Sequence, residues 1–270
     1  MHFTKAHAYG NDFLYVLSTD VTGAALDRLA QEMCERHSGL GADGLIVFEP
    51  NAAGAAMRLF NADGSRAEVS GNGVRGLGAV LLRNDPGPGH ELSVQTEAGL
   101  KHLTRIAREG SRQTFRISMG QPTGLQQTAI HVDQSALEVT VLNMGNPQCV
   151  VLGPLPGRDR FERIGAALER HSMFPDGTNV EFAEVEKPDL VRILIWERGV
   201  GPTSSSGTGS CAALVAAARY GGAAREADVV APGGPQRVEW RADGVYLTGW
   251  AEVICEGAWL KQIPRTSGTV

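Results

Sequence analysis

Two segments of the chain are apolar on nearly every side, unlike the rest of the sequence. They are Val74–Leu82 and Cys211–Ala218. A helix that lacks a polar face belongs in the middle of a protein core. A third segment, Leu26–His37, has its apolar residues on one face at helical spacing. The pattern therefore predicts two buried helices and one helix that covers a surface.

Short apolar runs of strand type surround these helices, and clusters of glycine and proline separate them. The runs cover residues 44–48, 57–60, 115–119, 139–142, 150–152, 180–185 and 191–196. Regular alternation of strand and helix is not seen. Many short strands with two buried helices predict an α+β fold, in which each domain is a curved mixed β-sheet wrapped around one central helix.

The sequence repeats itself at half its length. Gly10-Asn11 returns 135 residues further on as Gly145-Asn146. Three more segments return in the same order at an offset of 136: Gly41–Asp43 as Gly177–Asn179, Met57–Asn61 as Ile193–Glu197, and Ser70–Gly73 as Ser206–Gly209. Four matches in one order predict two copies of a single domain.

Each copy has the motif Ser-Gly-x-Gly at the start of its apolar helix, at Ser70 and at Ser206. Serine is a preferred N-cap residue, and glycine lets the backbone approach a ligand closely. The first N–H groups of a helix and its dipole favour an anion. One such motif alone is typical of ordinary helix capping. Two related copies predict two helix N-termini that point into one interdomain cleft from opposite sides, which suits inversion at a carbon acid with a base on one face and an acid on the other.

Composition and charge exclude several classes of protein. The 270 residues carry a net charge of −5, so the electrostatic footprint of a nucleic-acid-binding protein is missing. The longest apolar run is far shorter than the ~20 residues of a membrane span, and the N-terminus has no signal-peptide core. The 4 cysteines show no paired spacing. We expect a reduced, cytoplasmic protein that binds neither nucleic acid nor membrane.

Several longer motifs resemble the diaminopimelate epimerase family. They lie at residues 3–13, 36–45, 61–65, 70–75, 143–147, 178–182, 197–201 and 207–209. The resemblance implies two pseudo-twofold-related α+β domains with the active site in the interdomain cleft. It implies a first domain at residues 1–117, a second at 118–259, and a tail of about 260–270 that returns to the first.

The resemblance also implies a chemistry that uses no pyridoxal phosphate, no other cofactor and no metal. A thiolate and a thiol, one from each domain, would act on opposite faces of the substrate α-carbon. The implied substrate contacts are Asn11, Asn61, Gly71, Asn72, Asn146, Asn179, Glu197, Arg198, Gly207 and Thr208. Arg198 offers a planar fork for a carboxylate, and Glu197 and the asparagines suit ammonium groups. The expected partner is a small zwitterionic amino acid; whether the chain forms a homodimer stays open.

This chain departs from the family at the positions of proton transfer. Ser70 and Ser206 stand where the family has its catalytic cysteines, so they are the candidate catalytic residues. Gln148, a candidate supporting residue, stands where the family has histidine, and Pro202 where it usually has glutamate. A free thiol titrates near pH 8.5, whereas a serine hydroxyl does not titrate in the ordinary range.

Three explanations of the serines follow. They could be engineered Cys→Ser changes, although Gln148 and Pro202 count against that explanation. The scaffold could serve another reaction, such as an amino-acid isomerisation or a hydroxyproline-type dehydration that uses Ser70 and Ser206. The protein could also bind an amino acid without turnover. Epimerisation of L,L-diaminopimelate to the meso form, an isomerase step of lysine biosynthesis, is the leading hypothesis.

Overall fold

A computed structural model describes residues 1–85, 87, 89–132 and 135–266. The chain forms two compact units. Unit 1 is Met1–Arg116 together with the C-terminal segment from Trp250, and unit 2 is Ile117–Gly249. Two strands, β8 (Arg112–Gly120) and β17 (Gly244–Ala258), contain the points at which the chain passes from one unit to the other.

Unit 1 is built on a mixed sheet with two α-helices. Its remaining elements are β1 (His2–Ala8), β2 (Asn11–Leu17), η1 (Ser18–Val21), α1 (Leu26–Cys34), β3 (Gly44–Asn51), β4 (Gly54–Asn61), β5 (Arg66–Ala67), α2 (Gly71–Leu81), β6 (Glu91–Thr96) and β7 (Gly99–Glu109). β1 pairs antiparallel with β2, β2 parallel with β3, and β3 antiparallel with β4. β4 then pairs parallel with β6, and β6 antiparallel with β7. The second half of β17 lies antiparallel to β1.

Unit 2 repeats this topology element by element. Its elements are β9 (Thr123–Val132), β10 (Ser135–Asn143), β11 (Pro147–Leu152), α3 (Arg158–Glu169), β12 (Asn179–Lys187), β13 (Leu190–Glu197), β14 (Gly201–Thr203), α4 (Gly207–Ala216), η2 (Ala217–Gly221), β15 (Glu226–Ala231) and β16 (Gly234–Arg241). The series β10, β11, β12, β13, β15, β16 has the same antiparallel and parallel pairings as β1, β2, β3, β4, β6, β7. β9 lies beside β10 as β17 lies beside β1. The prediction of two similar α+β domains is confirmed.

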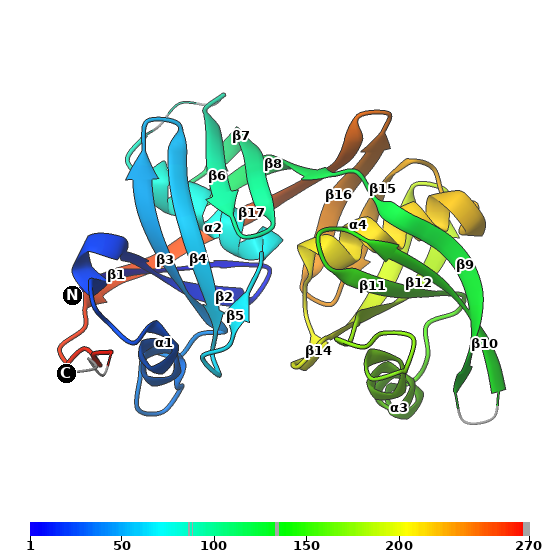
Figure 1. Ribbon diagram of the computed structural model, residues 1–270. Coiled ribbons are helices and arrows are strands. Elements are labelled where there is room, and N and C mark those ends of the chain that lie inside the picture. The colour runs from blue at the N-terminus through cyan, green and yellow to red at the C-terminus, as the bar shows by residue number, and fades with distance from the viewer. Residues whose placement is uncertain (86, 88, 133–134, 267–270) are drawn as a thin grey trace. The chain divides into compact units, whose positions relative to one another are not determined.

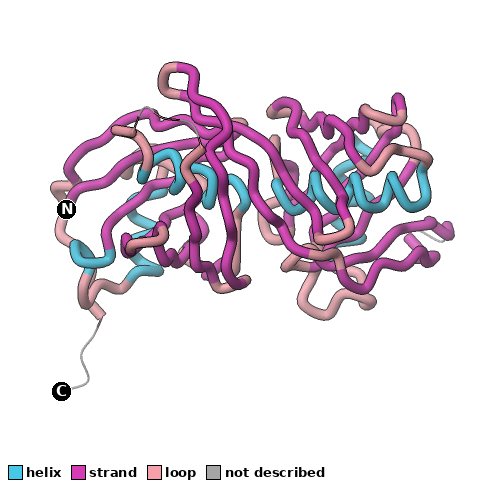
Figure 2. The backbone as a smooth tube through the Cα atoms, turned by 90° about the horizontal axis from the view of Figure 1, so that it is seen from above, coloured by secondary structure: helices cyan, strands magenta, loops and turns pink. Residues whose placement is uncertain are grey.

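The two helices predicted to be buried are the central helices of the units. Residues 71–80 of α2 and all of α4 are buried. Within unit 1, α2 packs against β1, β2 and β7, and within unit 2, α4 packs against six strands (Figure 1). Figure 2 shows α4 running between the strands of its unit. Because these helices are buried around their whole circumference, they need no polar face.

The other two helices, α1 and α3, lie on the opposite face of the strands. Alternation along a strand separates the two faces. In β12, Val180 and Phe182 belong to the core cluster that contains the α3 residues Phe161 and Ile164, whereas Glu181 lies against α4. Each unit therefore has three layers: an outer helix, a curved sheet and a central helix.

The structure differs from the sequence prediction at both outer helices. α3 lies where no helix was predicted, because many of its residues are charged, as in a loop, and only Phe161, Ile164 and Leu168 are buried hydrophobic residues. α1 ends at Cys34 instead of His37. The next residue, Glu35, has an extended backbone (ψ 127°), and its carboxylate accepts a hydrogen bond from the His37 N–H at 2.7 Å.

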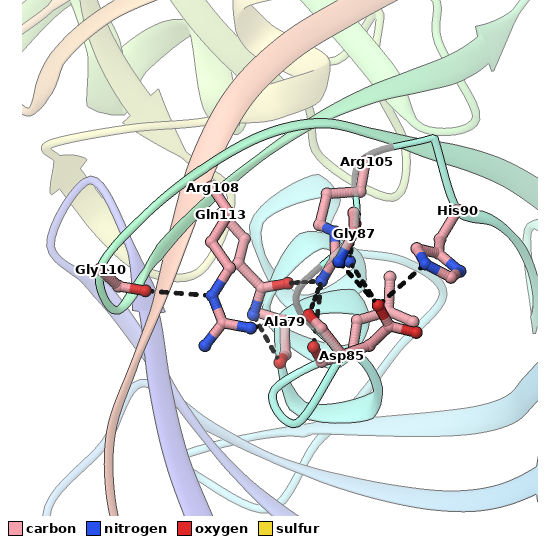
Figure 3. A network of polar contacts seen from close by, with 9 residues as sticks. Ala79, Asp85, Gly87, His90, Arg105, Arg108, Gly110 and Gln113 are labelled. Atoms are coloured by element: carbon pink, nitrogen blue, oxygen red, sulfur yellow. Dashed lines mark hydrogen bonds and ion pairs between the residues drawn. The ribbon is translucent and has the colours of Figure 1, made fainter.

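A buried arginine, Arg105 of β7, holds the C-terminal end of α2 (Figure 3). Its guanidinium donates to the carbonyl oxygens of Leu82 and Asp85, each at 3.0 Å, and to the side chain of Gln113 at 2.9 Å. Gln113 in turn donates to the carbonyl of Ala79 at 2.9 Å. The last carbonyls of a helix lack partners within the helix and attract positive charge. Arg105 therefore fixes α2 at the end opposite Ser70.

Candidate functional site

In unit 1 the candidate catalytic residue Ser70 is the N-cap of α2. Its backbone is extended (φ −129°, ψ 122°), and its Oγ accepts a hydrogen bond from the Gly73 N–H at 3.1 Å. Gly71 and Asn72 are the first two helical residues, so their N–H groups belong to the first turn and point out of the helix start. Ser70 thus lies at the positive end of the α2 dipole.

Predicted substrate-contact residues gather beside this helix start. The Asn72 side chain is buried, and its amide donates to Asn11 Oδ1 at 3.1 Å. Asn11 in turn donates to Asp43 Oδ2 at 2.8 Å. The Arg75 guanidinium donates to the Asn72 oxygen. Ser70, Asn72, Asn11 and Asp43 form what we call the α2 half-site.

Asn61 lies at the edge of the α2 half-site. It ends β4, and its β3 partner in the ladder is Gly44, the residue after Asp43. Its side chain donates to Ser65 Oγ at 2.9 Å. The structure thus places Asn61 near Asp43.

Two cations stabilise the acidic groups next to the α2 half-site. Lys5 Nζ lies 2.8 Å from Asp12 Oδ2, and Arg36 Nη2 lies 2.8 Å from Asp43 Oδ1 and 3.3 Å from Asp12 Oδ1. Burial opposes ionisation of Asp12, but the hydrogen bond and charge of Lys5, with those of Arg36, outweigh it and lower its pKa. Asp12 therefore stays ionised, and the charges of this corner are balanced.

In unit 2 the second candidate, Ser206, is the N-cap of α4 with almost the same backbone angles (φ −137°, ψ 128°). Its Oγ accepts from the Gly209 N–H at 3.1 Å and lies 3.5 Å from Thr208 Oγ1. Gly207 and Thr208 begin the helix. The prediction that each Ser-Gly-x-Gly motif begins an apolar helix is confirmed in both copies of the repeat.

Gln148 lies beside Thr208 and is almost fully buried. In the amide orientation that gives both ends a partner, its nitrogen donates to the two carboxylate oxygens of Glu181, at 3.0 and 3.1 Å. Its oxygen accepts from Thr208 Oγ1 at 3.2 Å and lies 2.6 Å from the Asn146 side chain. We call Ser206, Thr208, Gln148 and Asn146 the α4 half-site.

Two further predicted residues, Asn179 and Arg198, lie together at the ends of β12 and β13. The Arg198 N–H donates to Asn179 Oδ1 at 3.0 Å, and Asn179 donates to the Pro147 carbonyl at 3.2 Å. The exposed Arg198 guanidinium donates to the Asp176 carbonyl at 3.1 Å. Glu197, the last residue of β13, precedes Arg198, so both lie at the end of the strand.

Glu181 is the functional candidate that sequence reasoning missed. Its carboxyl group is fully buried on the α4 face of β12. Burial raises its pKa well above the ordinary value, and the charge of Glu197 raises it further. A signal was present in the sequence: an acidic residue stands inside an apolar strand, where unpaired charge is costly.

The chemistry available to these half-sites is that of proton transfer and amino-acid binding. Each has a hydroxyl at a helix N-terminus, with amide side chains and N–H groups that can hold a carboxylate or a carbanion. Within the described ranges, no group of three or more His, Cys, Asp or Glu residues could hold a metal ion. None of the helices in the described part of the chain is long and apolar enough to cross a membrane.

Comparisons of the sequence point in one direction. A family model described as diaminopimelate epimerase matches residues 3–125 and 140–254. The diaminopimelate epimerase of Desulforudis audaxviator (strain MP104C) is 40% identical over 283 residues, which cover 97% of this chain and 100% of that protein. The diaminopimelate epimerase of Bacteroides thetaiotaomicron is 38% identical over 259 residues, covering 94% and 96%.

Solved structures with a similar fold are more distant in sequence. A probable proline racemase from Agrobacterium radiobacter K84 has a TM-score of 0.76 at 15% identity, over 97% of this chain and 93% of that one. A hydroxyproline epimerase from Agrobacterium vitis has a TM-score of 0.75 at 16% identity, covering 95% and 91%. At such identities the likeness concerns the fold.

Proposed function

Because the chain belongs to the diaminopimelate epimerase family, we propose that it inverts the α-carbon of L,L-diaminopimelate to the meso form without a cofactor, an isomerase step of lysine biosynthesis. The observation that carries the proposal is the repeated half-site. Ser70 and Ser206 cap two buried helices with the same geometry, and each has amide side chains beside it.

In this proposal both half-sites act on one substrate. One serine enters as the alkoxide and accepts the α-proton from one face, which leaves a carbanion. The other serine donates its hydroxyl proton to the opposite face and leaves as the alkoxide. Atoms and charge therefore balance, and proton exchange with water resets the pair. The two helix N-termini stabilise the negative charge that develops on the substrate.

The substrate contacts in this proposal follow from the charges of a zwitterionic amino acid. The Arg198 guanidinium binds a carboxylate, because its planar fork matches two carboxylate oxygens. Glu197 and the side-chain oxygens of Asn11, Asn61, Asn146 and Asn179 accept from ammonium groups. The first helical N–H groups, at Gly71 and Asn72 in one half-site and at Gly207 and Thr208 in the other, bind the α-carboxylate. Gln148 supports Thr208 from behind.

We place this activity in the cytoplasm. All four cysteines are free thiols, and three of them, Cys34, Cys149 and Cys211, are buried. Free thiols are typical of a reducing compartment, because disulfides form and persist in oxidising ones.

The test is an exchange experiment in D₂O. The protein is incubated with L,L-diaminopimelate, and the α-proton signal and the appearance of the meso isomer are followed by NMR. Loss of the α-proton together with a new diastereomer is the expected result, and S70A/S206A is the control that should show neither. Loss of water from a hydroxyproline, or saturable binding without exchange, would replace epimerisation by dehydration or by simple binding.

A further inference from the structure

The strand registers show which residues correspond in the two units. In unit 1, β2 and β3 run parallel and pair Tyr15 with Ile46. In unit 2, β11 and β12 run parallel and pair Val150 with Glu181 at an offset of 135 on both strands. Glu181 therefore occupies the position that Ile46 has in unit 1.

The central helices give the same correspondence independently. A Cβ atom on Gly73, the third residue of α2, would lie 2.8 Å from Ile46 Cδ1. A Cβ atom on Gly209, the third residue of α4, would lie 2.6 Å from Glu181 Oε1. Each glycine lets its helix start lie directly on this residue. Beneath the cap serine, then, unit 1 has a hydrocarbon and unit 2 has a carboxyl group.

The Glu181 carboxyl group determines how the Gln148 amide is oriented. In the amide orientation that gives both ends a partner, the NH₂ end of Gln148 faces this carboxyl group, and its nitrogen lies 3.0 and 3.1 Å from the two carboxyl oxygens. The carbonyl end of Gln148 then faces Thr208 Oγ1 at 3.2 Å and must accept there. Because a hydroxyl has one proton, Thr208 is left with only acceptor capacity toward Ser206, 3.5 Å away.

We propose that Glu181 is a positioning residue, which orients Ser206 through Gln148 and Thr208 and makes the α4 half-site chemically different from the α2 half-site. This inference rests on the proposed epimerisation. Glu181 does not itself reach the substrate. It fixes the direction of each hydrogen bond from the core to the cap serine, so that the Ser206 hydroxyl proton is turned toward Thr208.

The α2 half-site has a different arrangement. Asn72 stands where α4 has Thr208, and it uses its NH₂ group on Asn11 and its oxygen on Arg75. Ile46 beneath it neither donates nor accepts a hydrogen bond. Ser70 is therefore not connected to a buried acid in the way that Ser206 is. A change at Glu181 should alter proton transfer at Ser206 and leave transfer at Ser70 unaffected.

The kinetic test measures α-proton exchange in D₂O from the L,L isomer and from the meso isomer separately. S206A and S70A first show which exchange depends on which serine. E181Q should lower the Ser206-dependent exchange about 10- to 100-fold and change the Ser70-dependent exchange less than about twofold, because a misoriented group costs rate only in its own step. A purely structural role would lower both exchanges equally, and that result would overturn the inference. I46L, the matched core variant in unit 1, should change neither exchange.

A spectroscopic test decides the same point without activity. In protein labelled with ¹⁵N-glutamine, the side-chain NH₂ resonances of Gln148 are identified by their absence from Q148L. In E181L these resonances should shift or broaden, because the acceptor that faces the NH₂ group is gone, whereas I46L should leave them in place. Unchanged Gln148 resonances in E181L would refute the inference. If wild-type protein shows no exchange with diaminopimelate, the proposed function fails, and the resonances still show whether Glu181 orients Gln148.

Discussion

The two central helices begin alike, but different side chains surround them. Ser70 and Ser206 cap α2 and α4 with hydrogen bonds of the same length, 3.1 Å. At the other end, Arg105 binds the carbonyl of Leu82, the C-cap of α2, whereas α4 continues into η2, whose C-cap is Gly222 in the left-handed region (φ 81°). The comparison teaches that the repeat has kept the backbone of the half-sites while the groups that act on the cap serines have diverged.

The difference is clearest in how each unit treats an acidic side chain. In unit 1, Asp12 has Lys5 2.8 Å away and Arg36 3.3 Å away, so its charge is compensated. In unit 2, Glu181 is fully buried and bonded to the neutral amide of Gln148. A buried acid with a neutral partner resists ionisation, whereas an ion-paired acid favours it. The two half-sites therefore differ in their local electrostatics.

The largest expected effect comes from restoring thiols at the caps. S70C/S206C should raise the rate of epimerisation by about 10²–10⁴-fold, because near neutral pH far more of a thiol than of a serine hydroxyl is ionised and ready to accept a proton. The rate of this variant should also level off with pH once the thiol has titrated, whereas the wild-type rate should keep rising, because a serine hydroxyl does not titrate in this range. Initial rates between pH 6 and 9 check both statements.

The single variants S70C and S206C sharpen the comparison. If Glu181 orients only Ser206, the two single variants should give unequal gains in rate. In S206C the thiol replaces a hydroxyl that Glu181 orients, whereas in S70C it replaces a hydroxyl that is not linked to a buried acid. Equal gains at every pH would contradict a chemical difference between the half-sites. If no variant gains in rate, the serines alone do not limit the reaction, and Gln148 and Pro202 limit it as well.

The next effect in size is on stability, at the glycines of the first helical turns. Alanine is favoured over glycine in a helix, but in G209A the new methyl group would meet Glu181 Oε1 at 2.6 Å and Ser206 Oγ at 3.1 Å. We expect a loss of about 1–3 kcal/mol in unfolding free energy, as for an overpacked core. G73A should lose less, because it meets the end of a flexible Ile46 side chain at 2.8 Å. Urea unfolding of both variants measures the difference.

Much of the fold could be predicted from the sequence, because the pattern and the repeat agreed. The apolar segments identified α2 and α4, and each predicted strand lies within an observed one, for example 180–185 within β12. α3 could not be predicted, since its helix depends on three buried hydrophobic residues that meet a core formed elsewhere in the chain. The outer helix exists because of tertiary packing, which overrides local composition.

The site was predictable only in part, for a physical reason. Serine, glycine and asparagine in repeated motifs pointed to the two helix starts, and the hydrogen bond of Asn72 to Asn11 joins two such motifs. Glu181 lies within the motif at residues 178–182, but its role depends on which face of β12 packs against α4. Period-two alternation identifies two faces and does not tell which helix covers each of them. The strand register supplies that information.

A smaller effect is expected from removing the caps one at a time. S70A and S206A should each cost about 1 kcal/mol of unfolding free energy, as is usual for loss of an N-cap side chain. Because both oxygens accept one N–H at 3.1 Å, the two losses should agree closely. Equal stability losses combined with unequal effects on exchange would locate the difference between the half-sites in proton transfer. A much larger loss for S206A would instead show that the α4 half-site is also the stability-limiting one.

The smallest expected effect is a pH dependence of stability with opposite signs in the two units. The pKa of Asp12 lies below its ordinary 3.8, so its contribution is present above that pH and is lost as the pH falls further. The pKa of Glu181 lies above its ordinary 4.5, so the folded state holds a proton that the unfolded state releases, and stability falls as the pH rises past 4.5. D12N should remove the loss of stability at acidic pH, and E181Q should remove the loss of stability as the pH rises toward neutral. Urea midpoints measured from pH 3 to 8 separate the two, since each variant should flatten one side of the curve and leave the other side as in the wild type.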